Sequence, residues 1–143
     1  MTDFTIRAEN MDEVQAALRK YGKDAERAIS RAVMASALAI DRDAKKRIQR
    51  GPKTGRTYRR GNVVHRASAP GESPATDTGR LVSGQTVRNL RKLSAAIDNN
   101  VAYAPHLEFG TQRIDARPFM APAVEAGKSD FARRVADAIR GLQ

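Results

Sequence analysis

The chain has 143 residues, a net charge of +10, no cysteine and few aromatic side chains, with three Tyr, four Phe and no Trp. This length suits one domain, 1–143, and the lack of cysteine excludes disulfides and thiolate metal sites as the basis of the fold. No apolar run reaches the roughly 20 residues that a membrane-spanning helix requires, so we expect no membrane segment. The positive charge favours a polyanionic partner, but charge alone does not choose between nucleic acid, an acidic protein and a membrane surface.

The N-terminal third of the chain predicts a strand followed by two helices. Residues 4–8 alternate apolar and polar side chains, as a short edge strand does. Asn10 is a candidate cap for a helix over residues 11–21, and Gly22 ends that helix. Residues 23–50 contain neither Gly nor Pro and repeat apolar side chains every three or four positions, which predicts a long amphipathic helix. Its apolar positions are Ile29, Val33, Ala37, Ile40, Ala44 and Ile48.

Basic charge is concentrated in the segment that follows. Residues 45–71 contain nine Lys or Arg and no Asp or Glu, whereas the rest of the chain has 17 basic against 16 acidic side chains. Four of the nine lie at the end of the long helix, where they also suit the helix dipole. Five glycines and three prolines in residues 51–79 argue against regular secondary structure. Because such long connections are uncommon in compact domains unless functional or disordered, we interpret residues 51–80 as an extended basic arm.

The second half of the chain predicts a hairpin and a C-terminal helix. Residues 85–90 and 94–99 carry strand-forming side chains on either side of a polar turn, although residues 90–93 also suit a helical turn. A helix is expected after residues 117–122, with a break at residues 127–130 as the alternative to one continuous helix. The chain order predicts an α+β fold, in which a long N-terminal helix and a C-terminal helix pack on a small antiparallel sheet.

The segment between the hairpin and the last helix is predicted to be irregular. Residues 101–107 are apolar and polar without a clear period and are interrupted by Pro105, and residues 109–111 form a loop.

The sequence contains no strong catalytic or metal-binding pattern. His106 and Glu108 could serve as the acid–base pair of a nuclease, but no third partner accompanies them, and a surface His beside a structural Glu is the simpler interpretation. The only other histidine is His65, and the acidic residues do not cluster. Residues 51–56 lack the spacing and the following helix of a phosphate-binding loop. We therefore expect no enzyme activity, no metal and no cofactor.

Two groups of motifs resemble a family of tailed-phage proteins. The run HRASAPGESPATDTGRL, from His65 to Leu81, resembles the proline-glycine segment and Thr-Gly-x-Leu turn of phage neck or tail-completion proteins, the family named after the tenth gene product of a lambdoid siphophage. The C-terminal signature of that family is resembled by Tyr103-Ala104, the run from Glu108 to Thr111, and the run from Ala116 to Met120 with Pro122-Ala123. With the long helix ahead of the Thr-Gly turn, the resemblance covers nearly the whole chain.

The resemblance implies a non-enzymatic virion protein, made in the cytoplasm of a bacterial host, that joins the DNA-filled head to the tail or ends the tail tube. It implies a homo-oligomeric ring, with six-fold or twelve-fold symmetry, around the DNA channel. The implied partners are neighbouring connector and tail-tube proteins, and direct contact with the passing DNA is left open. The alternative is a basic protein that binds nucleic acid without sequence specificity.

These expectations fall on named residues. We expect a subunit or partner interface at Lys53, Arg56, Arg59, Arg60, Arg66, Tyr103, Glu108 and Thr111. The fold signature comprises Gly79, Leu81, Phe109, Gly110, Arg117, Pro118 and Phe119.

Some of these residues have a more specific expected role. Gly110 should adopt a backbone conformation that residue types with a Cβ do not adopt, and Phe119 should anchor the last helix in the core. Glu108 should accept hydrogen bonds from Arg117 or Arg113. The arm should contact an acidic neighbouring subunit or ring and order on assembly, because a strongly cationic channel lining would retain passing DNA.

Overall fold

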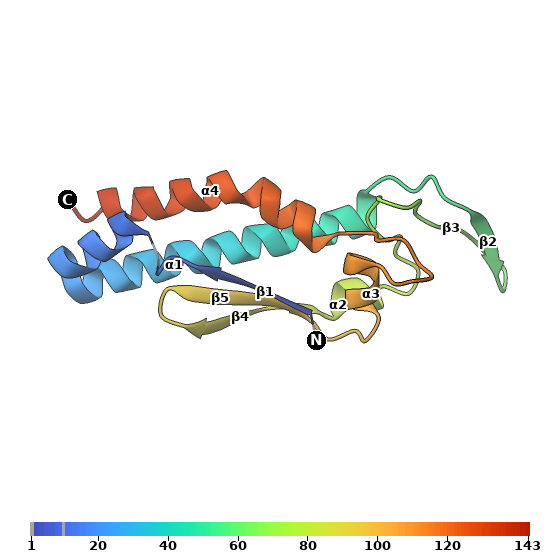
Figure 1. Cartoon of the computed structure of the whole chain (residues 1–143), viewed down its shortest axis with the longest axis horizontal. Helices are drawn as coiled ribbons and strands as arrows, with labels where there is room; N and C mark the ends of the chain where they lie inside the picture. Colours follow the sequence, from blue (N-terminus) through green and yellow to red (C-terminus); the bar gives the residue numbers. More distant parts are fainter. Residues whose placement is uncertain (1, 10) are drawn as a thin grey trace.

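The computed structural model describes residues 2–9 and 11–143 and is built along one long helix (Figure 1). In chain order the elements are β1 (Thr2–Arg7), α1 (Asp12–Arg50), β2 (Thr57–Arg60), β3 (Val63–Arg66), α2 (Arg80–Ser83), β4 (Gln85–Arg91), β5 (Ser94–Asn99), α3 (Ala104–Phe109) and α4 (Met120–Arg140). The helices combine with small antiparallel sheets, so the predicted α+β class is confirmed.

Helix α1 consists of two helices joined at Gly22. The Gly22 backbone is non-helical, with φ 53° and ψ −125°, a conformation that favours glycine because it has no Cβ. The two predicted helices and the boundary between them are therefore confirmed. The predicted Asn10 cap lies outside the described residues, and the first helix begins at Asp12. All six apolar positions predicted for the second helix are buried.

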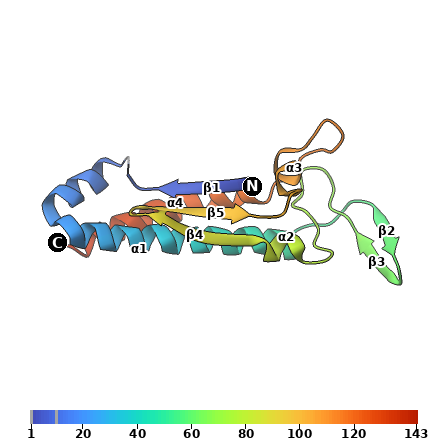
Figure 2. The ribbon, with the colours of Figure 1, turned by 90° about the horizontal axis from the view of Figure 1, so that it is seen from below.

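The larger sheet has the strand order β1-β5-β4 and is antiparallel throughout. Strands β4 and β5 form the predicted hairpin, and Leu93 in its turn has a positive φ of 63°. Because β5 is the central strand, all of its residues are buried. Ala95 and Ile97 join the core beneath α1, and the alternation of side chains places Ala96 and Asp98 on the opposite face. Seen from below, the sheet lies in front of the two long helices, with β4 across α1 (Figure 2).

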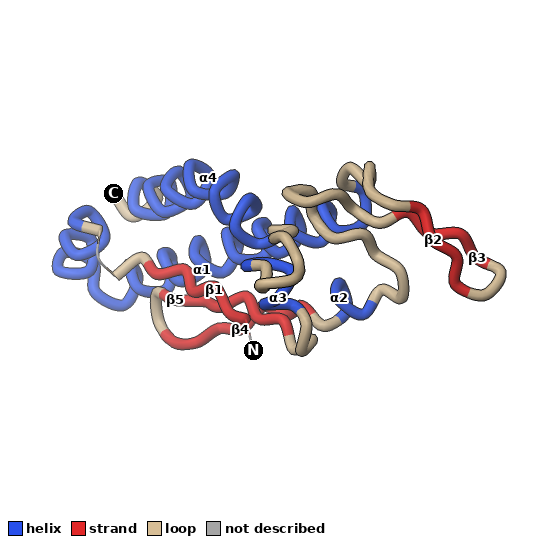
Figure 3. The backbone as a smooth tube through the Cα atoms, turned by 45° about the vertical axis from the view of Figure 1, so that its right-hand side comes forward, coloured by secondary structure: helices blue, strands red, loops and turns tan. Residues whose placement is uncertain are grey.

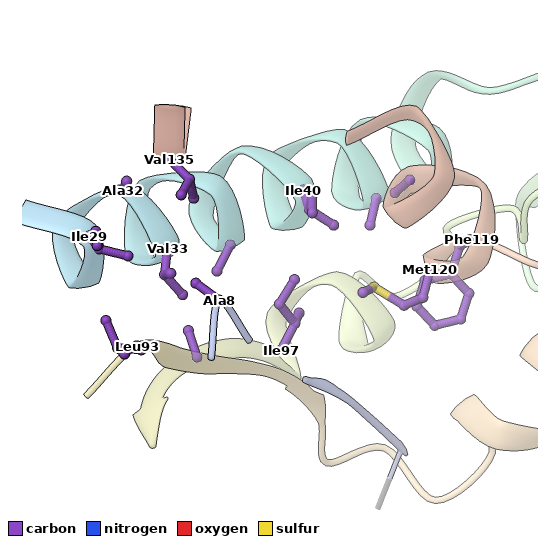
Figure 4. Close-up of a cluster of buried hydrophobic side chains, with 14 of the residues drawn as sticks. Ala8, Ile29, Ala32, Val33, Ile40, Leu93, Ile97, Phe119, Met120 and Val135 are labelled. Carbon is purple, nitrogen blue, oxygen red and sulfur yellow. The ribbon is translucent and has the colours of Figure 1, made fainter. Parts of the chain in front are cut away.

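The core lies between α1, the sheet and the start of α4. Figure 4 shows Ile29, Val33 and Ile40 of α1 above Leu93 and Ile97, with Phe119 and Met120 at one end of the cluster. Phe119 is fully buried. Helix α4 packs mainly along α1, so the prediction that both long helices lie on the sheet is wrong for α4.

Helix α4 is continuous from Met120 to Arg140, so the alternative of a break near Gly127 is also wrong. Gly127 lies where α4 crosses close to Ile40 of α1. A Cβ built at Gly127 would come within 2.6 Å of Ile40 Cγ1. This glycine therefore permits close helix packing, which offsets its low helix propensity.

Two regions predicted to be irregular have regular structure. Residues 57–66 of the arm form the β2–β3 hairpin, which projects from one end of the molecule (Figures 1 and 3). The prediction was wrong because Gly61 lies in the turn, with φ 60°, and the other glycines and prolines flank the strands. Residues 104–109 form α3, whose first turn accommodates Pro105. In the described part of the chain, no helix combines the length and apolar character needed to cross a membrane.

Candidate functional site

The basic arm and the C-terminal signature, which are separate in the sequence, lie together at one end of the molecule. Hydrogen bonds link the segment after the hairpin to the segment before α4: Gly71 N–H donates to Ala116 O at 3.0 Å, and Ser73 Oγ donates to Pro118 O at 2.9 Å. Figure 2 shows α2 and α3 on the same side of the molecule as the β2–β3 hairpin. The arm and the C-terminal signature therefore form one continuous surface region.

Lys53 fixes the base of the arm. Its Nζ donates hydrogen bonds to the carbonyl oxygens of Pro74 at 2.9 Å, Ser73 at 3.3 Å and Arg47 at 3.4 Å. Burial lowers the pKa of Lys53, and the nearby Glu72 carboxylate opposes that shift. Lys53 thus connects the last turn of α1 to the far side of the arm. Lys53 therefore has acceptors within the chain, and its expected contact with a partner stays a prediction.

Glu72 fixes the base of the arm from the other side. Its carboxylate accepts hydrogen bonds from the side-chain hydroxyl and backbone N–H of Thr54 and from the backbone N–H of Ala69 at 2.8 Å. These hydrogen bonds, the Thr54 hydroxyl first, lower the pKa of Glu72 to about 2. The stem of the arm is therefore held by specific bonds, in contrast to the expected irregular arm.

One face of the hairpin is turned towards Asp77. The β2–β3 register places Tyr58 opposite His65 and Arg60 opposite Val63, so these four side chains share a face. Arg60 Nη1 lies 2.6 Å from Asp77 Oδ2, and His65 Nε2 lies 3.0 Å from Asp77 Oδ1. The rings of Tyr58 and His65 are stacked with their centroids 5.6 Å apart. Arg60 therefore has an intramolecular partner, while Arg56, Arg59 and Arg66 are exposed.

Glu108 connects α3 to the start of α4. Its Oε2 accepts hydrogen bonds from the backbone N–H groups of Phe119 at 2.9 Å and Met120 at 3.0 Å, and its Oε1 accepts one from Ala121 at 2.8 Å. These amides have no partners within their own helix, and a negative charge is favourable at this end of α4.

The expectations for Glu108 are therefore corrected. It is buried within the chain rather than placed at a subunit boundary, and its partners are backbone amides rather than Arg117 or Arg113. Because both carboxylate oxygens are already engaged, Glu108 is also a poor general base beside His106. Arg117 contributes its backbone instead, since its N–H donates to Leu107 O at 2.6 Å.

Gly110 and Thr111 shape the loop between α3 and α4. Gly110 has φ 74° and ψ 176°, the expected conformation that residue types with a Cβ rarely adopt. A Cβ at this position would also lie 2.9 Å from Ala116 N. Thr111 Oγ1 accepts hydrogen bonds from the N–H groups of Arg113 and Ile114, each at 3.1 Å. Thr111, expected at an interface, therefore has a demonstrable role in forming this loop.

Large apolar side chains are exposed around this loop and on the hairpin. Phe109 is 69% exposed, although it belongs to the expected fold signature, and Tyr103 is 41% exposed. Among the described residues, six of the large apolar side chains that are exposed lie at this end: Tyr58, Val63, Val64, Tyr103, Phe109 and Ile114.

The turn before α2 completes this end of the molecule. Gly79 has φ 76° and precedes α2, and Leu81 behind it is buried. Arg60, Asp77 and Tyr103 are among the residues that line a hollow of about 260 Å³ beside this turn. Across residues 2–9 and 11–143, no three His, Cys, Asp or Glu side chains group as a metal site would require.

Sequence reasoning missed Val63, Val64 and Ile114 as exposed residues, and Glu72 and Asp77 as the acidic anchors of the arm. The dipeptide Gly61-Asn62 ahead of two adjacent valines is a hairpin signal that was available in the sequence. The bonds of Glu72 and Asp77 depend on the folded arm and leave no local pattern.

No protein-family model matches the chain, and comparisons with curated proteins and with solved structures likewise give no match.

Proposed function

We propose that the protein is a non-enzymatic structural component of a tailed-phage neck or tail terminus, which assembles into a homo-oligomeric ring around the DNA channel. The motif resemblance supports the phage setting. The observation that carries the assembly role is the exposure of Phe109 on a rigid support. The neighbouring connector or tail-tube proteins would contact the ring, and virion assembly would take place in the host cytoplasm.

Phe109 is held outward by the residues on either side of it. Glu108 is bonded to the first amides of α4, and Gly110 lies against the backbone of Ala116. The chain around Phe109 therefore cannot turn inward without breaking these contacts. An aromatic side chain that a rigid support keeps in water is typical of a protein–protein contact. Tyr103 and Ile114 extend the apolar area, which suits the core of a subunit interface.

In a ring, each subunit uses one surface to contact a different surface of the next subunit, and the rotation that relates neighbouring subunits closes the ring. The chain is elongated (Figure 1), and six of its exposed large apolar side chains lie at one end, which suits such a heterologous contact. The apolar end supplies one of the two surfaces.

Sedimentation velocity of the full chain and two variants tests this proposal. We expect Phe109→Ser to shift the wild-type oligomer towards monomer, because the buried aromatic anchor is lost. Leu90→Ser is the matched control, since Leu90 is also exposed but lies in the β4–β5 hairpin. Assembly of Phe109→Ser equal to that of wild type would show that this surface is not the subunit contact.

Binding of nucleic acid without sequence specificity is the second candidate, favoured by the exposed arginines of the hairpin. Tight binding of double-stranded DNA at physiological salt, lost when Arg56, Arg59 and Arg60 are replaced by Ala, would support it.

A further inference from the structure

The hairpin has a second face, which points away from Asp77. The register places Thr57 opposite Arg66 and Arg59 opposite Val64, and these four side chains share the face opposite to Tyr58 and Arg60. We call Arg59, Val64 and Arg66 the outer hairpin face. Val64 is 63% exposed, and both arginines are exposed as well.

Local hydrogen bonds orient both arginines of this face. Arg59 Nε donates to Gly61 O at 3.2 Å, and Arg66 Nε donates to Gly55 O at 3.3 Å. In each case a bond from Nε restrains the side chain and leaves the terminal nitrogens able to donate elsewhere. Such a planar pair of donors matches a carboxylate or phosphate group, and restraining it in advance reduces the entropy lost on binding.

We propose that the outer hairpin face binds an acidic protein surface that has an apolar side chain among its carboxylates, and that this surface belongs to a different protein. The biological partner rests on the proposed function, in which a neighbouring connector protein would supply the acidic surface. The contact itself uses residues other than Phe109, so it can be tested separately from ring formation.

Exposed valine favours a protein partner over DNA. Val64 is adjacent to Arg59 across the strands and to Arg66 along its own strand, and a phosphate backbone offers it no apolar contact. The aromatic side chain of the hairpin also has a stacking partner within the chain, since the Tyr58 ring stacks on His65 rather than on a base.

The charge distribution favours a different protein over a second copy. Of the 16 acidic side chains, at least eleven already have partners within the chain. They are Asp24, Glu26, Asp41, Asp43, Asp77, Asp98, Glu125, Asp130 and Asp137 in ion pairs, and Glu72 and Glu108 in hydrogen bonds. With a net charge of +10, a second copy would repel the hairpin rather than neutralise it.

Fluorescence anisotropy with the full chain and labelled probes tests the proposal at physiological salt. The first probe is a peptide of repeating Glu-Ser-Val-Ser, which places Glu and Val on one face of an extended strand. The second replaces each Val with Ser, so that charge is kept and the apolar groups are lost. The third is a double-stranded DNA oligonucleotide.

We expect the valine-containing peptide to bind more tightly than the serine peptide and the DNA. The double variant Arg59→Gln/Arg66→Gln should weaken its binding about ten-fold or more, because charge-assisted hydrogen bonds are lost. Val64→Thr should reduce its binding to the level of the serine peptide. The matched control Arg19→Gln/Arg31→Gln removes the same charge from exposed positions of α1 and should bind as wild type does.

Three results would overturn the proposal. Tighter binding of the DNA than of the valine-containing peptide would identify a nucleic-acid surface. An equal loss of binding in the α1 control would show attraction by net charge alone. A change in the oligomeric state of Arg59→Gln/Arg66→Gln by sedimentation would make a second copy the occupant. These three results do not depend on whether the Phe109→Ser variant still assembles.

Discussion

Glu108 and Phe119 are joined by a hydrogen bond that fixes α3 against the beginning of α4. The backbone N–H of Phe119 donates to Glu108 Oε2 at 2.9 Å, and both residues are buried. Phe119 fills the end of the core, while Phe109, the residue after Glu108, is turned to solvent. One carboxylate thus couples the core to the exposed aromatic side chain that we propose for assembly.

Replacing Glu108 should destabilise the fold. Glu108→Ala leaves the buried amides of Phe119 and Met120, and the amide of Ala121, without this acceptor, which should cost about 2–4 kcal/mol in the free energy of unfolding. Glu108→Gln retains one acceptor oxygen without the charge and should cost less. Urea denaturation measures both, and a Glu108→Ala value within about 0.5 kcal/mol of wild type would contradict this role.

Gly127→Ala should destabilise the α1–α4 contact, even though Ala is the better helix former. The added Cβ would meet Ile40 Cγ1 at 2.6 Å, and overpacking of this kind costs about 1–3 kcal/mol, against a gain of about 1 kcal/mol in helix propensity.

The double variant Gly127→Ala/Ile40→Ala controls for that mechanism. It removes the obstructing atoms, so its loss of stability should be smaller than the sum of the two single losses. Strict additivity in thermal unfolding would show that the two positions do not interact.

The base of the arm should loosen in acid through Glu72. Its pKa is lowered from 4.5 to about 2 in the folded chain, so its stabilising contribution is complete above pH 4.5 and is lost as the pH falls towards 2. The NMR shifts of the Thr54 and Ala69 amides should follow this titration, with a midpoint well below 4.5. Glu72→Gln should abolish it, and a midpoint near 4.5 in wild type would mean that these hydrogen bonds do not persist in solution.

The regular periodic elements could be predicted from the sequence, because each is specified by neighbouring residues. Ile29 to Ile48 follow the helical repeat, Gly22 interrupts it, and the β4–β5 hairpin follows from strand-forming side chains around a polar turn. The α+β class follows from the order of these elements.

The candidate site was harder to predict, because its decisive contacts join residues far apart in the chain. Lys53 was assigned to a subunit or partner interface, and its acceptors at Ser73 and Pro74 are known only once the arm is folded. Glu108 was assigned to an interface because nothing local shows that it meets the amides of α4. Pro105 was interpreted as a break, although proline is tolerated in a first helical turn.

Native mass spectrometry of the full chain tests the central claim most directly, since it counts the subunits in each assembly. We predict a closed homo-oligomer with six-fold or twelve-fold symmetry as the principal species, and its dissociation in Phe109→Ser. A protein that stays strictly monomeric at every concentration, and does not join a virion when head and tail proteins are present, would contradict the proposed ring.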